Sequence, residues 1–288
     1  MNLKKSLLIA LLSFGVAQSA LAETNSEKLD RATQLYKQQN YSAAFPLLKQ
    51  LGEKGNAKAQ AVLGTMYMFG QGITQNSQQA VYWYTKAAEQ GAAKAQSMLG
   101  FMYTNGLGVT QNSQQAVYWF TKAAEQGAAE VQLYLGVMYA NGQGVAQNYQ
   151  QAVYWFTKAA EQGIAEAQLY LGVMYANGQG VAQNYQQAVY WFTKAAEQGI
   201  AEAQLYLGVM YANGQGVAQN YQQAVYWFTK AAEQGIAEAQ LYLGDMYEKG
   251  RGAQKNVSTA KAFYGQACDN GNAQGCKDFA RLDKQGVR

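Results

Sequence analysis

The feature that most constrains this chain is a long internal repeat. Residues 164–199 read IAEAQLYLGVMYANGQGVAQNYQQAVYWFTKAAEQG, and residues 200–235 repeat them letter for letter. Variants of the same 36-residue unit occupy residues 56–91, 92–127, 128–163 and 236–271, so six units follow one another. A fixed period of roughly 20–50 residues indicates stacked supersecondary units, none of which buries its apolar face alone. The sequence therefore predicts a solenoid in which neighbouring units complete one another's cores.

Each unit carries the pattern of two helices joined by a glycine turn. A first helix, helix A, is predicted in residues 164–199 by the spacing of one buried face in Ala167, Leu171, Met174, Tyr175 and Gly178. Gly178 and Gly180 favour the left-handed conformation that ends a helix, and Asn184 is a good N-cap for the second helix, helix B. The predicted buried stripe of helix B is Ala188, Trp191, Phe192 and Ala195.

Composition narrows function chiefly through a missing residue type. The 288-residue chain has no histidine, which excludes Ser-His-Asp and Cys-His catalytic arrangements and histidine metal sites. Its formal charge of +4 comes without a clustered Lys/Arg stripe, so nucleic-acid binding is not indicated. Because 49% of the residues are hydrophobic and 14% are charged, we expect a folded chain. We also expect that it holds no metal and no cofactor.

Residues 1–22, MNLKKSLLIALLSFGVAQSALA, are typical of a signal peptide. Two lysines precede an apolar run from Leu7 to Val16, and a small-x-small cleavage site ends at Ala22. The run is shorter than the roughly 20 residues that a membrane-spanning helix needs. We predict cleavage after Ala22, a periplasmic or secreted location, and no stable membrane insertion of the mature chain.

The segments on either side of the units are expected to close the array. Residues 23–55 contain two apolar stripes of helical spacing around a turn at Asn40, which predicts a degenerate N-terminal helical hairpin. Residues 272–288 are expected to form a C-terminal capping helix and tail. Terminal units of a solenoid are usually atypical because one of their faces meets solvent.

The order of residues within the unit resembles a known repeat. Ala-x-Ala-Gln-x-x-Leu-Gly-x-x-Tyr-x-x-Gly-x-Gly-Val, then the cap, then Ala-x-x-Trp-Phe-x-x-Ala-Ala-x-x-Gly is similar to the Sel1-like repeat (SLR), a relative of the tetratricopeptide repeat. The resemblance implies an all-α, right-handed superhelical solenoid of helix-turn-helix units. It also implies an adaptor that binds proteins of the bacterial envelope or of a host. The family commonly has Asp at the cap where this chain has Asn, which caps a helix about as well.

Cys268 and Cys276, the two cysteines of the chain, lie near its C-terminus with a short turn between them. Their spacing of eight residues resembles the disulfide of cysteine-rich SLR proteins that some pathogens secrete. Export favours a disulfide over the alternative of two reduced buried thiols. In the entropic model, so small a closed loop would stabilise the end of the array by roughly 2–3 kcal/mol.

The same cysteine-rich proteins raise the alternative of β-lactam-binding or β-lactamase-like activity. The chain has one Ser-x-x-Lys tetrad, Ser258-Thr259-Ala260-Lys261, and no Ser-Asp-Asn or Lys-Thr-Gly partner motif. The tetrad falls in the first turn of a predicted repeat helix, where Ser and Thr are ordinary residues. The recurring Asn-Gly-Gln-Gly-Val loops lack the Lys-Ser/Thr of a phosphate-binding loop and are predicted to be turns. We therefore predict that the protein is not an enzyme.

A second stripe on helix A is the candidate binding surface. In the reference unit, Glu166, Tyr170, Val173 and Asn177 lie away from the predicted buried face, on the side expected to line the concave surface. The predicted binding residues are Met98, Phe101, Tyr134, Val137, Tyr170, Val173, Tyr206, Val209 and Tyr242. Rows of exposed apolar side chains often mark a binding site. The alternative is that these residues pack between adjacent helices A and only stiffen the array.

Together these observations favour a monomeric, non-enzymatic scaffold that binds proteins. A purely architectural spacer without a partner is a further alternative. The identity of residues 164–199 and 200–235 would offer identical side chains at a regular spacing, which suits an extended ligand. Recent tandem duplication explains that identity equally well.

Overall fold

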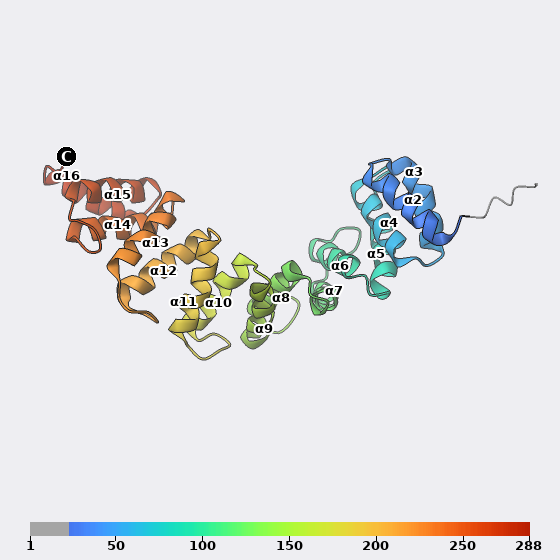
Figure 1. Cartoon of the computed structure of the whole chain (residues 1–288), viewed down its shortest axis with the longest axis horizontal. Helices are drawn as coiled ribbons and strands as arrows, with labels where there is room; N and C mark the ends of the chain where they lie inside the picture. The colour runs from blue at the N-terminus through green and yellow to red at the C-terminus, as the bar shows by residue number, and fades with distance from the viewer. Residues whose placement is uncertain (1–22) are drawn as a thin grey trace, which may run out of the picture. The chain divides into compact units, whose positions relative to one another are not determined.

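The structure, a computed structural model, describes residues 23–288, and the predicted signal peptide at residues 1–22 lies outside the described residues. Within residues 23–288 there are fifteen helices, α2 to α16, and no strand. The all-α solenoid of helix pairs is therefore confirmed. The chain divides into two compact units, of which the first ends at Asn112 and the second spans Ser113–Arg288 (Figure 1).

The first compact unit contains five helices that pack in chain order, each against the next. They are α2 (Asn25–Lys37), α3 (Tyr41–Glu53), α4 (Ala57–Phe69), α5 (Ser77–Glu89) and α6 (Ala93–Asn105). The first two pack against each other, and Asn40 caps α3 by accepting a hydrogen bond from the Ala43 N–H.

The second compact unit continues the same pattern with ten helices. They are α7 (Ser113–Glu125), α8 (Ala129–Asn141), α9 (Tyr149–Glu161), α10 (Ala165–Asn177), α11 (Tyr185–Glu197), α12 (Ala201–Asn213), α13 (Tyr221–Glu233), α14 (Ala237–Lys249), α15 (Val257–Asp269) and α16 (Ala273–Lys284). Even numbers from α4 to α14 are the helices A of the six repeats, and odd numbers from α5 to α15 are their helices B.

The predicted signals at the helix ends are present. Gly178 follows α10 with φ 68°, a left-handed conformation that favours glycine, and closes that helix. Asn184 then accepts a hydrogen bond at 3.1 Å from the backbone N–H of Gln187 and so caps α11. Because the same pair of signals recurs in the other repeats, the helix boundaries keep the 36-residue period of the sequence.

Close packing between helices A and B depends on glycine in helix A. A Cβ atom on Gly208 of α12 would lie 2.6 Å from the ring of Phe228 of α13, which is too close for any side chain there. Ala203 and Leu207 of the same helix are fully buried, as is Ala224 of α13. The repeat therefore alternates small and large residues across each helix pair, as close-packed cores require.

A buried glutamine joins neighbouring repeats. Gln168 of α10 donates a hydrogen bond at 3.1 Å to the carbonyl of Ala160 at the end of α9 and accepts one at 2.8 Å from Gln198, the residue that follows α11. Both bonds satisfy the amide of a side chain that is only 4% exposed. The glutamines buried in this way are Gln60, Gln96, Gln132, Gln168, Gln204 and Gln240.

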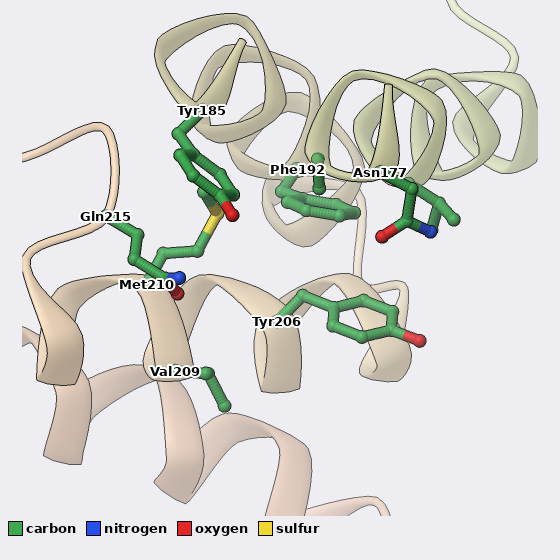
Figure 2. Close-up of a pocket in the computed structure, with 9 residues that line it drawn as sticks. Asn177, Tyr185, Phe192, Tyr206, Val209, Met210 and Gln215 are labelled. Carbon is green, nitrogen blue, oxygen red and sulfur yellow. The ribbon is translucent and has the colours of Figure 1, made fainter. Parts of the chain in front are cut away.

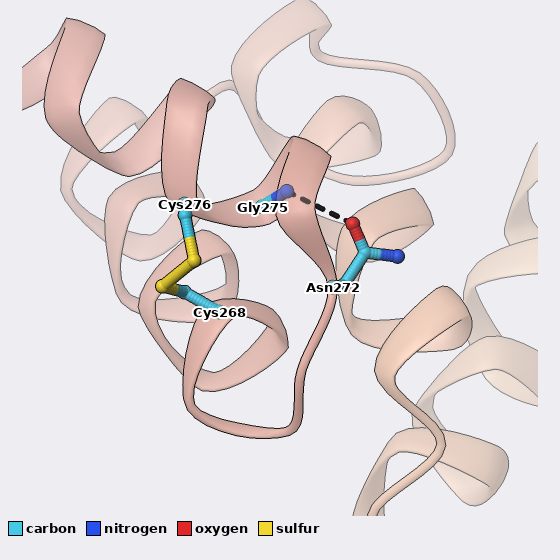
Figure 3. Close-up of a disulfide and its surroundings, with 4 residues drawn as sticks. All are labelled: Cys268, Asn272, Gly275 and Cys276. Carbon is cyan, nitrogen blue, oxygen red and sulfur yellow. Dashed lines mark hydrogen bonds between the residues drawn. A yellow bond between two sulfur atoms is a disulfide. The ribbon is translucent and has the colours of Figure 1, made fainter.

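The C-terminal end of the array is held by covalent and ionic contacts. Cys268 of α15 and Cys276 of α16 form the predicted disulfide, beside the Asn272 cap that accepts a hydrogen bond from the Gly275 N–H (Figure 3). Arg281 of α16 donates two hydrogen bonds of 2.8 Å to the carboxylate of Glu248 in α14, which lowers the pKa of that carboxyl. The last helix is thus tied both to α15 and to α14.

Candidate functional site

The candidate site is the stripe of side chains on helix A that the sequence predicted to face a partner. Three of its tyrosines are exposed, Tyr134 by 60%, Tyr170 by 42% and Tyr206 by 43%, and Phe101 of the first compact unit is also exposed. The other predicted residues are half-buried, namely Met98, Val137, Val173, Val209 and Tyr242. The stripe therefore combines exposed aromatic rings with half-buried aliphatic side chains and the half-buried ring of Tyr242.

Each stripe tyrosine of the second compact unit also packs against the preceding repeat. The ring of Tyr170 stacks on Phe156 with centroids 4.9 Å apart, and Tyr206 stacks on Phe192 at 5.1 Å. Tyr242 stacks in the same way on Phe228 at 4.9 Å. Each ring thus packs on helix B of the preceding repeat, and Tyr170 and Tyr206 still keep a large exposed area. A ring fixed in this way loses little conformational entropy when it binds.

A cavity of about 290 Å³ opens on this stripe between α10, α11 and α12. Figure 2 shows the rings of Phe192 and Tyr206 lying one above the other, with Tyr185, Met210 and Gln215 grouped at one end. The residues that line the cavity are Val173, Ala176, Asn177, Tyr185, Phe192, Tyr206, Val209, Met210 and Gln215. The lining contains three of the predicted binding residues and no carboxylate or ammonium group.

The sequence repeats this lining. Thirty-six residues earlier the same residue types stand in the same order: Val137, Ala140, Asn141, Tyr149, Phe156, Tyr170, Val173, Met174 and Gln179. Thirty-six residues later two of them change, because Asp245 replaces the valine and Arg251 replaces the glutamine. Arg251 lies over the ring of Tyr221, with 5.9 Å between the guanidinium carbon and the ring centroid. The last repeat thus has two charged residues, Asp245 and Arg251, at positions that are uncharged in the two repeats before it.

A row of carboxylates accompanies the tyrosines. Glu130, Glu166, Glu202 and Glu238 are exposed in the first turns of α8, α10, α12 and α14, and none of them forms an ion pair within residues 23–288. Each stands four residues before a tyrosine of the stripe, which places the two side chains on one face of the helix. The Tyr242 hydroxyl donates a hydrogen bond of 3.3 Å to Glu238. The pKa of Tyr242 is raised, mainly by burial and also by the negative charge of that carboxylate.

A second aromatic row, on helix B, was not predicted from the sequence. Tyr190 is half exposed, meets Trp191 edge-to-face at 4.9 Å, and has the ammonium group of Lys194 over its ring at 5.1 Å. The same trio recurs in repeats one to five, and its tyrosines are Tyr82, Tyr118, Tyr154, Tyr190 and Tyr226. The recurring Tyr-Trp-x-x-Lys pattern could have predicted this exposed row. The tryptophan beside each tyrosine, however, suggests that the pair is buried in the core.

Ser258 and Lys261 of the Ser-x-x-Lys tetrad form hydrogen bonds with the C-terminal residues of the chain. The Ser258 hydroxyl donates a hydrogen bond to the carbonyl of Arg288. Lys261 donates to the Asp283 carboxylate at 2.7 Å and to the Val287 carbonyl at 2.6 Å. Both side chains thus anchor the C-terminal tail to α15.

Two further kinds of feature are absent from the part of the chain that the structure describes. Residues 23–288 contain no group of three or more His, Cys, Asp or Glu side chains that could hold a metal ion. They also contain no helix that combines the length and the apolar character needed to cross a bilayer.

The chain matches a known repeat family over most of its length. The family model of the Sel1 repeat matches six segments, residues 57–91, 93–127, 129–164, 165–200, 201–236 and 237–272. No curated protein matches the chain.

Two solved structures are similar to this chain in both sequence and fold. One is c5321, a protective antigen of uropathogenic Escherichia coli with an SLR fold, at 40% identity and a TM-score of 0.74 over 84% of this chain and 52% of that one. The other is a Sel1 repeat protein of Oxalobacter formigenes, at 35% identity and a TM-score of 0.64 over 83% of this chain and 96% of that one. The chain thus spans about half the length of c5321.

Proposed function

Because this chain belongs to the Sel1 repeat family, whose members are typically protein-interaction scaffolds, we propose that it is an exported scaffold that binds a protein partner through the helix A stripe. The observation that carries the proposal is the row of Tyr134, Tyr170 and Tyr206, which are exposed although each stacks on the preceding repeat. Large, immobilised aromatic rings are the side chains that most often dominate the binding energy of an interface.

The cavity beside Tyr206 supports the same reading. Its apolar walls suit an apolar side chain of a partner. The side-chain amides of Asn177 and Gln215 could form hydrogen bonds with the peptide groups on either side of that side chain. The family's general character favours a binding role over catalysis, so we propose that the protein is not an enzyme.

Export is the second part of the proposal. The signal-peptide pattern of residues 1–22 and the disulfide between Cys268 and Cys276 both suit an oxidising compartment outside the cytoplasm. The partner would then be a protein of the cell envelope or of a host, as the family resemblance implies. We propose that the scaffold works as a monomer in the periplasm or outside the cell.

Capture of partners from envelope extracts tests the binding surface. The wild-type protein is compared with a variant that carries Tyr134→Ala, Tyr170→Ala and Tyr206→Ala. A matched control carries Tyr154→Ala, Tyr190→Ala and Tyr226→Ala on helix B, with the same number of half-exposed tyrosines removed. We expect the first variant to lose proteins that the wild type and the control retain. Equal recovery by all three proteins would favour an architectural spacer.

A further inference from the structure

We propose that the helix A stripe of the second compact unit binds an extended, arginine-rich segment of a protein partner. The inference rests on the proposed function, because it names the chemistry of the partner at the same surface. Its starting point is the combination of exposed tyrosine rings, an apolar cavity and a row of carboxylates along α8, α10, α12 and α14.

The charges of the stripe are complementary to a cationic ligand. Glu130, Glu166, Glu202 and Glu238 are exposed and have no ion-pair partner among the lysines and arginines of residues 23–288. The lysines of the neighbouring helices B lie over the tyrosines of the helix B row, as Lys194 does over Tyr190. The carboxylate row is thus left for an external cation.

The geometry of each repeat favours arginine over lysine. A glutamate and a tyrosine four residues apart on one helix, such as Glu166 and Tyr170, share one face of the helix, and in α14 such a pair is close enough for the Tyr242 hydroxyl to bond Glu238. A guanidinium group can stack on the ring and pair with the carboxylate at once, because it is planar and weakly hydrated.

The chain itself places a guanidinium against this surface one repeat later. Arg251 stands where the cavity has Gln215, and it lies over Tyr221, the counterpart of Tyr185 in the cavity lining. A half-buried aspartate, Asp245, occupies the position of Val209 in that repeat. An arginine is therefore already compatible with the aromatic wall that the other repeats present without one.

Fold stability alone does not require these glutamates. A carboxylate in the first turn of a helix is favoured by the helix dipole, and this would account for Glu130 or Glu166 without any ligand. In the first compact unit, however, the same position of helix A is Lys58 in α4 and Lys94 in α6, and those helices form equally well. The stripes of the two units thus present opposite charges on the same frame.

The repeat period indicates an extended ligand. One cavity is lined by both α10 and α12, so successive repeats present their stripes to one continuous segment. An extended chain advances about 3.3 Å per residue, so a segment of roughly three residues covers about 10 Å of the stripe. A suitable probe is a fluorescent peptide of four Arg-Leu-Ser triplets, and four Glu-Leu-Ser triplets serve as its charge-reversed counterpart.

The test measures binding of these two peptides to the purified protein by fluorescence anisotropy. One variant carries Glu166→Gln, Glu202→Gln and Glu238→Gln. The control variant carries Glu161→Gln, Glu197→Gln and Glu233→Gln, which remove the same three charges from the ends of helices B. Circular dichroism verifies that all proteins remain folded.

We expect the arginine peptide to bind the wild type and the glutamate peptide not to bind. The stripe variant should bind the arginine peptide roughly 10-fold or more weakly, since each exposed ion pair accounts for about a 2- to 5-fold effect, and the control should change by less than about 2-fold. Absence of binding by the arginine peptide, equal binding by the glutamate peptide, or equal losses in the two variants would overturn the inference.

The variant with Tyr134, Tyr170 and Tyr206 changed to alanine separates this inference from the proposed function. If it loses captured partners while the stripe glutamates have no effect on peptide binding, the surface binds a partner of another charge and only the present inference fails. If the tyrosine variant also keeps every captured partner, the proposed function fails with it.

Discussion

The two compact units share one frame and differ in the stripe that helix A presents. In the first unit, the Gln60 amide donates to the carbonyl of Gly52 at 2.9 Å, just as Gln168 donates to Ala160 in the second. Gly64 faces the ring of Tyr84 at the place where Gly208 faces Phe228. Packing and hydrogen bonding therefore fix these residues in both units, whatever the protein binds.

The stripe, in contrast, differs between the two units in its charged residue and in the residue four positions later. The first unit has Lys58 with Val62 and Lys94 with Met98, whereas every helix A from α8 to α14 has glutamate followed by tyrosine. The frame tolerates either set because these side chains lie outside the buried core. The residues of the stripe thus vary between the two units while the residues that specify the fold stay the same.

The largest effect should come from breaking the shared frame. Leu63 in the first unit and Leu171 in the second are both fully buried, so Leu63→Ala and Leu171→Ala should each lower the free energy of unfolding by about 2–5 kcal/mol. Urea titration measures both, and the exposed Gln186→Ala serves as a control within about 0.5 kcal/mol of wild type. A small loss at one leucine only would mean that the two units do not share a frame.

The buried glutamines should come next. Gln168→Leu removes the partner of the Ala160 carbonyl and of Gln198, and we expect a loss of about 1–3 kcal/mol because buried polar groups are left unsatisfied. Gln60→Leu should have a similar effect in the first unit, where Gln60 also accepts a hydrogen bond from Gln90. Urea titration is again the measurement, and an unchanged midpoint for either variant would show that the amide bonds contribute nothing.

A difference at alkaline pH should distinguish α5 of the first unit from the helices B that carry phenylalanine at the position of Tyr84. Burial raises the pKa of Tyr84 to about 12. In the second unit the corresponding residue is phenylalanine in α7, α9, α11 and α13, whereas α15 has Tyr264, whose pKa is also raised by burial. A raised pKa gives stability that is fully present below the unfolded pKa of 10 and is lost as the pH rises towards 12, by an amount on the order of 2 kcal/mol. Tyr84→Phe should remove that loss.

The measurement is the urea midpoint of Tyr84→Phe and wild type at pH 7, 9 and 11. At pH 7 the variant should lie within about 1 kcal/mol of wild type, because it loses one hydrogen bond to Thr65. Above pH 10 the gap should close or reverse. Parallel pH profiles would show that Tyr84 does not titrate with unfolding.

The smallest effect should come from exchanging the stripe. Lys94→Glu together with Met98→Tyr gives α6 the glutamate and tyrosine of the second unit, and both positions lie outside the buried core. We expect roughly a 2- to 5-fold gain in affinity for the arginine peptide, measured by anisotropy. The Lys94→Glu variant alone controls for charge, and a gain no larger than its own would show that the tyrosine adds nothing.

The sequence predicts the frame well because its signals are local or periodic. Gly178 and Asn184 end and begin helices by their own conformational and hydrogen-bonding preferences, and a period of 36 residues repeats those signals. The role of Gln168 is not visible in the same way, since its amide partner Gln198 lies 30 residues along the chain. A polar residue within an apolar stripe indicates that its side chain needs a hydrogen-bond partner, but the sequence does not show which residue that partner is.

The candidate site is only partly predictable for a related reason. Spacing places Tyr170 on the outer stripe of helix A, but it cannot show that the ring also stacks on Phe156 of the preceding repeat. Tyr190 of the helix B row was not predicted because a buried tryptophan follows it directly, and the pair suggests core. In both cases exposure depends on how neighbouring repeats pack, which one unit's sequence does not specify.

Site-specific photo-crosslinking in cells that produce the protein shows whether the helix A stripe, and not the helix B row, contacts a partner. A photoreactive phenylalanine derivative is placed at Tyr170 on the helix A stripe or at Tyr190 on the helix B row, two positions of similar exposure in the same repeat. The account predicts a discrete crosslinked protein from position 170, identified by mass spectrometry, and none from position 190. A crosslinked partner from position 190 alone would contradict it.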